Sequence, residues 1–68
     1  MKQAEILRGF VAASALSRAA IAELLGVSES TLSRVLAGTR KLGSRKAAEV
    51  ARHIGVAEEK ILDFVLNK

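Results

Sequence analysis

The stretch GVSESTLSRVLAG, residues 26–38, combines a turn, a helix start and a helix stop in one short segment. Gly26 can adopt the positive φ that ends a preceding helix, and Ser28 can cap the start of the next helix. Gly38 can end the helix that begins after Ser28. The linker is too short for a hairpin of two long antiparallel helices, so we expect the helices on either side of it to cross sharply.

The helix predicted over residues 29–37 has two chemically different faces. At about 100° per residue, its small and charged side chains occupy a sector about 140° wide, and its large aliphatic side chains lie opposite. We therefore expect one face to pack against the rest of the chain and the other to remain free for binding. The outer face holds Glu29, Ser30, Ser33, Arg34 and Ala37, and the inner face holds Leu32, Val35 and Leu36.

Glycine and serine delimit four further helices, and no segment shows the alternation of a strand, so the predicted fold class is all-α. The predicted ranges are 2–14, 18–25, 45–54 and 58–66. Ser17 and Ser44 are the expected caps of the second and fourth helices. In the second helix, Leu24 is expected to point inward with its neighbours Ile21 and Leu25. Gly9 lies inside the first helix at a cost of up to about 1 kcal/mol, so we expect it to permit a close helix approach.

Length and composition narrow the function classes. The 68 residues predict a single domain, 1–68, which buries only about 60% of the surface of its unfolded chain. With no cysteine and one histidine, stability must come from helix packing or oligomerisation. We find no metal-ligand set, catalytic pair or phosphate loop, and expect no enzyme, metal, cofactor or small-molecule ligand. No apolar run approaches a membrane span or a signal peptide, so a cytoplasmic protein without a membrane partner is expected.

Positive charge is concentrated in the middle of the chain. The net charge is +4, and residues 34–46 carry five basic side chains and no acidic one. The remainder, 47–68, has three basic residues and four acidic ones. This asymmetry indicates a surface that meets a polyanion, with an ordinary solvated face as the alternative.

Residues 18–37 have the spacing of a helix-turn-helix. Small or apolar side chains stand where two crossing helices must touch, namely at Ile21, Ala22, Gly26, Val27, Leu32 and Val35. Residues 16–62 resemble the Cro and phage-repressor family of lambda-repressor-like DNA-binding domains, through the GVS turn, the glycine after the third helix and the passage A…IGV…EE. The stretch 26–36 is also similar to the Lac-repressor headpiece, but that domain begins at the first helix of the motif. A whole helix precedes the motif here, so the five-helix lambda-repressor-like bundle is the better match.

The resemblance implies that the helix over 29–37 reads the major groove of double-stranded DNA. Arg34 can donate two hydrogen bonds to a guanine edge, and Glu29 can accept one from a cytosine amino group. The predicted base-reading residues are Glu29, Ser30, Thr31, Ser33 and Arg34. The predicted phosphate-binding residues are Ser17, Arg18, Thr39, Arg40, Lys41 and Arg45, for each of which simple surface solubility is the alternative. Many members of the family carry glutamine in place of Arg18 and Glu29.

The last helix has more apolar surface than one core contact needs. The side chains from Ile61 to Leu66 include five apolar ones that span about 200°, against roughly 100° in an ordinary surface helix. The surplus indicates a partner, and the resemblance implies a two-fold homodimer, because in several relatives this terminal helix makes the dimer contact. The predicted interface consists of Ile61, Phe64, Val65 and Leu66, with either Phe64 or Leu66 as the exposed edge. A larger core is the alternative.

These features predict a small dimeric transcription regulator, most similar to a Cro-like phage or prophage repressor on a palindromic operator. In a dimer, the two recognition helices would lie about 34 Å apart, one turn of DNA. One alternative is an antitoxin-type module that binds another protein through the last helix and also binds DNA. Another is the N-terminal DNA-binding fragment of a longer repressor.

Overall fold

The structure is a computed structural model, which describes residues 2–67 and forms five α-helices over that range. They are α1 (Lys2–Ala13), α2 (Arg18–Leu25), α3 (Glu29–Ala37), α4 (Ser44–His53) and α5 (Glu58–Leu66). No described residue lies in a strand, which confirms the all-α prediction. None of the helices within residues 2–67 is long and apolar enough to cross a membrane.

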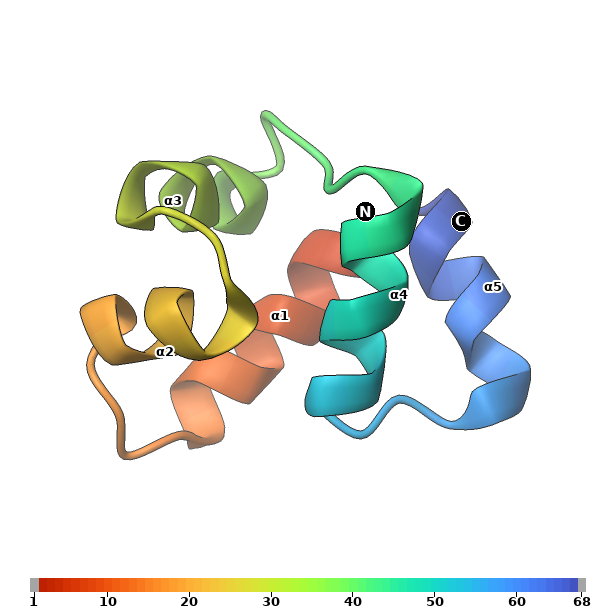
Figure 1. The fold of residues 1–68 in the computed structure, drawn as a ribbon, viewed down its shortest axis with the longest axis horizontal. Coiled ribbons are helices and arrows are strands. Elements are labelled where there is room, and N and C mark those ends of the chain that lie inside the picture. Colours follow the sequence, from red (N-terminus) through yellow and green to blue (C-terminus); the bar gives the residue numbers. More distant parts are fainter. Residues whose placement is uncertain (1, 68) are drawn as a thin grey trace.

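The helices are arranged around α1, as Figure 1 shows. The pair α2 and α3 lies at one end of the molecule and α5 lies at the other, with α1 and α4 between them. Helix α4 packs mainly against α5, whereas α1 contacts both α3 and α5. Helix α1 therefore connects the two ends of the domain.

The core receives side chains from all five helices and from the connection before α4. The largest side chains in its interior are aliphatic, except for Phe64 of α5 and one amide, Gln3 of α1. The connection contributes Leu42, which is buried although its neighbours are exposed. The other large buried residues are Leu7, Ile21, Leu25, Leu32, Val35, Leu36, Val50 and Ile61.

The ends of α2 and α3 follow the local chemistry of the sequence. The Ser17 Oγ accepts a hydrogen bond from the Ala20 N–H at 3.2 Å, which caps α2. Gly26 and Gly38, with φ of 72° and 79°, end α2 and α3 in the left-handed conformation. The fourth helix differs from the prediction, because Gly43 is its N-cap and Ser44 is its first residue, without a side-chain cap.

Two expectations about packing are wrong. Leu24 is 47% exposed, because the inner face of α2 is centred between Ile21, Ala22 and Leu25, and Leu24 lies about 100° to one side of that centre. Gly9 does not serve a close approach, since a Cβ at this position would meet nothing within 4 Å. The glycine is exposed on α1 and only weakens that helix.

We predict that Gly9→Ala raises the free energy of unfolding by about 0.5–1 kcal/mol, because alanine restricts the unfolded chain and meets no neighbour in the helix. Chemical denaturation measures the change. Gly26→Ala is the matched control and should destabilise the domain, because alanine is strained at a φ of 72°. A loss of stability in Gly9→Ala would show that α1 needs the glycine.

Candidate nucleic-acid interface

Helix α3 presents a polar face to solvent while its aliphatic face is buried. Leu32, Val35 and Leu36 pack into the core. The side chains predicted to read bases are exposed at four positions, Glu29, Ser30, Ser33 and Arg34. The division of the helix into an inner and an outer face is therefore as predicted from the helical wheel.

Thr31, the fifth residue predicted to read bases, belongs to the cap of α3. Its N–H donates to the Ser28 Oγ at 3.0 Å, and its own Oγ1 accepts from the Ser28 hydroxyl at 2.9 Å. The side chain is only partly exposed. The structure thus gives Thr31 a role in starting the helix, and its contact with a base stays a prediction.

The C-terminal end of α3 is held by two side chains that donate to its last carbonyl groups. The Thr39 hydroxyl donates to the Arg34 carbonyl oxygen at 3.2 Å, and the Thr39 N–H donates to the same oxygen at 3.1 Å. From α1, the Arg8 Nε donates to the Leu36 carbonyl oxygen at 2.7 Å. The Thr39 hydroxyl hydrogen is used here to cap α3, so the phosphate contact expected of this residue stays a prediction.

The connection from α3 to α4 is basic on its outside and anchored on its inside. Arg40 and Lys41 are exposed, whereas the next side chain, Leu42, is buried. The Leu42 N–H donates to the Oε1 of Gln3 at 2.9 Å. Arg40 and Lys41 therefore directly precede a residue that is anchored by its buried side chain and by its backbone hydrogen bond.

The first turn of α4 continues this basic surface. Arg45 is exposed, and within residues 2–67 it has no ion pair, nor have Arg34, Arg40 and Lys41. Lys46 differs, since its Nζ lies 3.0 Å from the Glu49 Oε2. The hydrogen bond from Lys46 and its positive charge lower the pKa of the Glu49 carboxyl. Lys46 is thus partly neutralised, and the other four cations remain available to an anion.

The parts of this surface follow one another in space. In Figure 1, α3, the connection and the start of α4 run along one edge of the molecule. Arg18 is exposed at the first position of α2, directly after the cap residue Ser17. The Ser17 hydroxyl already accepts from the α2 backbone, so a phosphate contact at Ser17 stays a prediction.

Two of the four residues expected at the dimer interface of α5 are buried. Phe64 is 1% exposed and Ile61 is 9% exposed, because α5 turns both into the core that it shares with α1 and α4. These two side chains therefore do not belong to the surface of the domain. Leu66, at the other edge of the apolar stripe, is 47% exposed, and Leu62, one turn before it, is 66% exposed. Val65 lies between these extremes as a partly buried residue.

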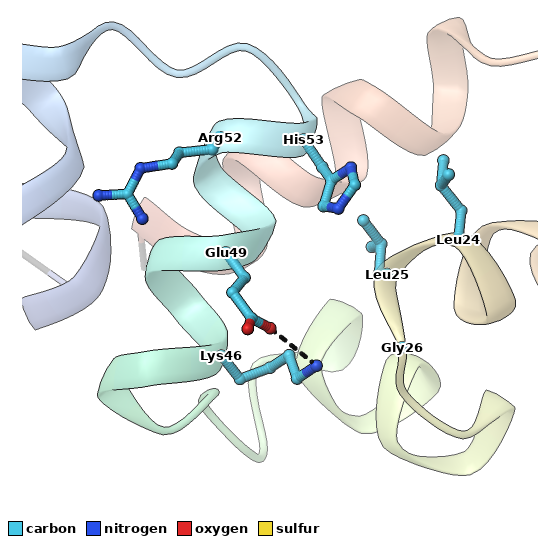
Figure 2. Close-up of a pocket in the computed structure, with 7 residues that line it drawn as sticks. All are labelled: Leu24, Leu25, Gly26, Lys46, Glu49, Arg52 and His53. Carbon is cyan, nitrogen blue, oxygen red and sulfur yellow. Dashed lines mark ion pairs between the residues drawn. The ribbon is translucent and has the colours of Figure 1, made fainter.

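An open hollow lies between the end of α2 and the outer face of α4 (Figure 2). It is lined by Leu24, Leu25, Gly26, Lys46, Glu49, Arg52 and His53. Lys46 and Glu49 are paired with each other, and the Arg52 guanidinium is directed away from the leucines. The described residues contain no group of three potential metal ligands, here or elsewhere. We therefore assign no chemistry to this hollow.

Comparison with known families gives the class of the protein. A model of the helix-turn-helix domain family matches residues 4–64, which is nearly the whole chain. The chain belongs to this family and is a helix-turn-helix DNA-binding domain, with α2 and α3 as its two motif helices. No curated protein and no solved structure matches the chain.

Sequence reasoning missed Arg8, Leu42 and Gln3, which fix the candidate interface through contacts on its inner side. Leu42 could have been noticed as the one large apolar side chain in an otherwise polar connection. Arg8 and Gln3 give no comparable signal, because their partners are 28 or more residues away along the chain.

We predict that Ser28→Ala lowers the free energy of unfolding by about 1 kcal/mol, because the Thr31 N–H loses its acceptor at the start of α3. Ser28→Asp is the matched control, since a carboxylate keeps an acceptor there and is favoured at a helix N-terminus. Chemical denaturation of both variants measures the difference. Equal losses in the two variants would mean that the cap does not stabilise α3.

Proposed function

We propose that this protein is a sequence-specific transcription regulator that inserts the exposed face of α3 into the major groove of double-stranded DNA. The main support is the combination of a polar helix face, fixed at both ends, with four exposed basic side chains on α3, the connection and the first turn of α4, none of which has an ion pair within residues 2–67. A helix held in this way can present its side chains to base edges without first having to be ordered.

The residues of α3 suggest how sequence would be recognised. Ser30 and Ser33 are short, which allows the helix backbone to approach the floor of the groove. Arg34 can donate two parallel hydrogen bonds to the O6 and N7 of a guanine. Glu29 can accept from a cytosine amino group and is repelled by nearby phosphates, so it would act mainly against wrong sites.

The basic side chains outside α3 would bind phosphates. Arg18, Arg40, Lys41 and Arg45 are exposed and flank α3 along the chain. Each phosphate that they neutralise would release counterions from the DNA, so affinity would fall as salt rises. These contacts would fix the orientation of the domain on the duplex and carry no sequence information themselves.

The remaining parts of the proposal concern assembly and biological role. Leu62 and Leu66 form an exposed apolar pair on α5, and Val65 lies beside them. A two-fold dimer through this pair would bind a palindromic operator and exclude polymerase from it, as a Cro-like phage or prophage repressor in the cytoplasm would. We propose a binding protein without a catalytic role, metal, cofactor or small-molecule ligand.

The same leucine pair supports a second candidate. In an antitoxin-type module, Leu62 and Leu66 would hold a different protein while α3 still binds DNA. Purification from the native host separates the candidates, because an antitoxin would copurify with a partner in fixed stoichiometry and a repressor would not.

The DNA-reading role of α3 is tested with Arg34→Ala on a duplex selected from a random pool by the wild-type protein. We predict a loss of about 1–3 kcal/mol in binding free energy on the selected duplex and a much smaller loss on random DNA. Titrations at several salt concentrations measure both. Arg40→Ala is the matched control and should weaken binding to all duplexes alike. Its salt slope, the slope of the logarithm of the binding constant against the logarithm of salt concentration, should be smaller in magnitude by about one unit. Equal weakening on both DNAs by Arg34→Ala would contradict base reading by this residue.

The dimer is tested by placing a charge on the exposed edge of α5. We predict that Leu66→Glu keeps the helical content of the wild type, sediments as a monomer and binds a palindromic duplex much more weakly. Phe64→Glu is the contrasting variant and should unfold the domain, because it buries an unpaired carboxylate in the core. A wild-type protein that is monomeric both at tens of micromolar and on DNA would rule out this interface.

A further inference from the structure

We propose that Gln3 is a positioning residue for phosphate binding, which holds the basic connection between α3 and α4 at a fixed place relative to the last turn of α5. The inference rests on the proposed function, since it assigns a role to a residue that does not itself touch DNA. It is carried by three hydrogen bonds of one buried residue, to partners 39, 61 and 64 residues away.

Gln3 uses every polar group that it brings into the interior. Its side chain is 1% exposed. The Oε1 accepts from the Leu42 N–H at 2.9 Å, and the Nε2 donates to the Phe64 carbonyl oxygen at 3.1 Å. Its backbone N–H donates to the Asn67 Oδ1 at 2.9 Å. Among the described residues, no buried side-chain nitrogen or oxygen lacks a partner.

The site is specific for an amide in one orientation. The Leu42 N–H faces the Oε1 as a donor and the Phe64 carbonyl faces the Nε2 as an acceptor, so a rotated amide would place like groups against each other. A methionine or leucine would fill similar space and gain more from burial, but it could satisfy neither group. What the amide adds is therefore a fixed geometry between its two partners.

Leu42 is the point at which this geometry reaches the interface. Residues 40–43 belong to no helix, and the Leu42 N–H is directed to Gln3 instead of to another backbone group. The exposed Arg40 and Lys41 directly precede it. Because phosphate binding depends on where these cations lie along the duplex, the anchor at Leu42 sets how many phosphates the connection can reach.

The other side of Gln3 lies at the end of α5. Phe64 and Asn67 belong to the last turn and the C-cap of that helix, next to the exposed Leu66. The Gln3 side chain donates to the Phe64 carbonyl oxygen, and the Gln3 backbone N–H donates to the Asn67 Oδ1. This N–H lies in the first turn of α1, where backbone N–H groups have no partner inside the helix. Gln3 thus sets the spacing between the phosphate-binding connection and the helix end that carries the proposed dimer contact.

The test uses Gln3→Met, which removes both side-chain hydrogen bonds without leaving a large cavity. At a temperature where the variant is folded, we expect its salt slope for duplex binding to fall by up to about two units, toward that of a variant with Arg40→Ala and Lys41→Ala. The preference for the selected duplex over random DNA should stay, because Ser28 and Arg8 still hold α3.

Ile54→Ala is the control for mere destabilisation. Ile54 is a partly buried side chain at the C-terminal end of α4, away from the connection that precedes this helix. The Ile54→Ala variant should have a lower free energy of unfolding than the wild type and the same salt slope. A slope that falls equally in Ile54→Ala would mean that loosening the core, and not the loss of the anchor, weakens phosphate binding, which overturns the inference.

Gln3→Glu provides a rescue that depends on pH. Burial and the facing Phe64 carbonyl should raise the pKa of the introduced carboxyl, and below that pKa the acid offers one acceptor and one O–H donor, like the amide. Above that pKa the carboxylate still accepts from the Leu42 N–H and loses only the donor to the Phe64 carbonyl. We therefore expect a slope near the wild-type value at about pH 5 and a slope between those of the wild type and Gln3→Met at about pH 8, relative to wild type at the same pH. A slope at about pH 5 as low as that of Gln3→Met, although the acid then offers both an acceptor and a donor, would overturn the inference.

Hydrogen exchange tests the anchor without DNA. The Leu42 amide should exchange at least about tenfold faster in Gln3→Met than in the wild type, while the Val50 amide inside α4 keeps its protection. Unchanged protection at Leu42, or a wild-type salt slope in the folded Gln3→Met protein, would overturn this inference and leave the proposed function standing. A wild-type protein that binds no duplex would overturn the proposed function and, with it, the role of Gln3.

Discussion

The buried amide of Gln3 joins three parts of a chain that has few means of stabilisation. It connects α1 with the C-terminal end of α5 and with the connection before α4. Its removal would leave the buried Leu42 N–H without a partner and the Phe64 carbonyl with only the Asn67 N–H. An unpaired buried group costs about 1–3 kcal/mol, a large share of the stability of a domain this small. With no disulfide, the contact of α1 with α5 depends on this amide, on the hydrogen bond from the Gln3 N–H to the Asn67 Oδ1 and on the packing of Phe64.

The helix that would read DNA is held separately from this junction. Ser28 starts α3, Gly38 and Thr39 end it, and Arg8 reaches its last turn from α1. Its inner side chains are buried, so its outer side chains can vary without loss of packing. This separation would allow base recognition to change through exposed residues while the phosphate-binding connection stays anchored by Gln3.

The charges of the domain favour one direction of approach to a duplex. Cations lie on α3, the connection and the first turn of α4, whereas the acidic Glu58 and Glu59 lie at the start of α5. In Figure 1, α5 is at the opposite end of the molecule from α2 and α3. A polyanion would therefore be attracted to the α3 side and repelled from the start of α5, which leaves the exposed leucines of α5 available to a second copy or another protein.

Local chemistry was sufficient to predict the helices, the turn and the two faces of α3. Ser17, Ser28, Gly26 and Gly38 act on groups within a few residues of themselves, so their roles follow from the order of the chain. The all-α fold and the helix-turn-helix were predictable for this reason. The packing partners were not: the helical wheel of α5 has two equivalent apolar edges, and contact with α1 and α4 buries Phe64 and leaves Leu66 exposed. The hydrogen bonds of Arg8 and Gln3 likewise join residues from 28 to 64 positions apart, and neither spacing nor composition carries that information, because such contacts exist only once the helices have packed.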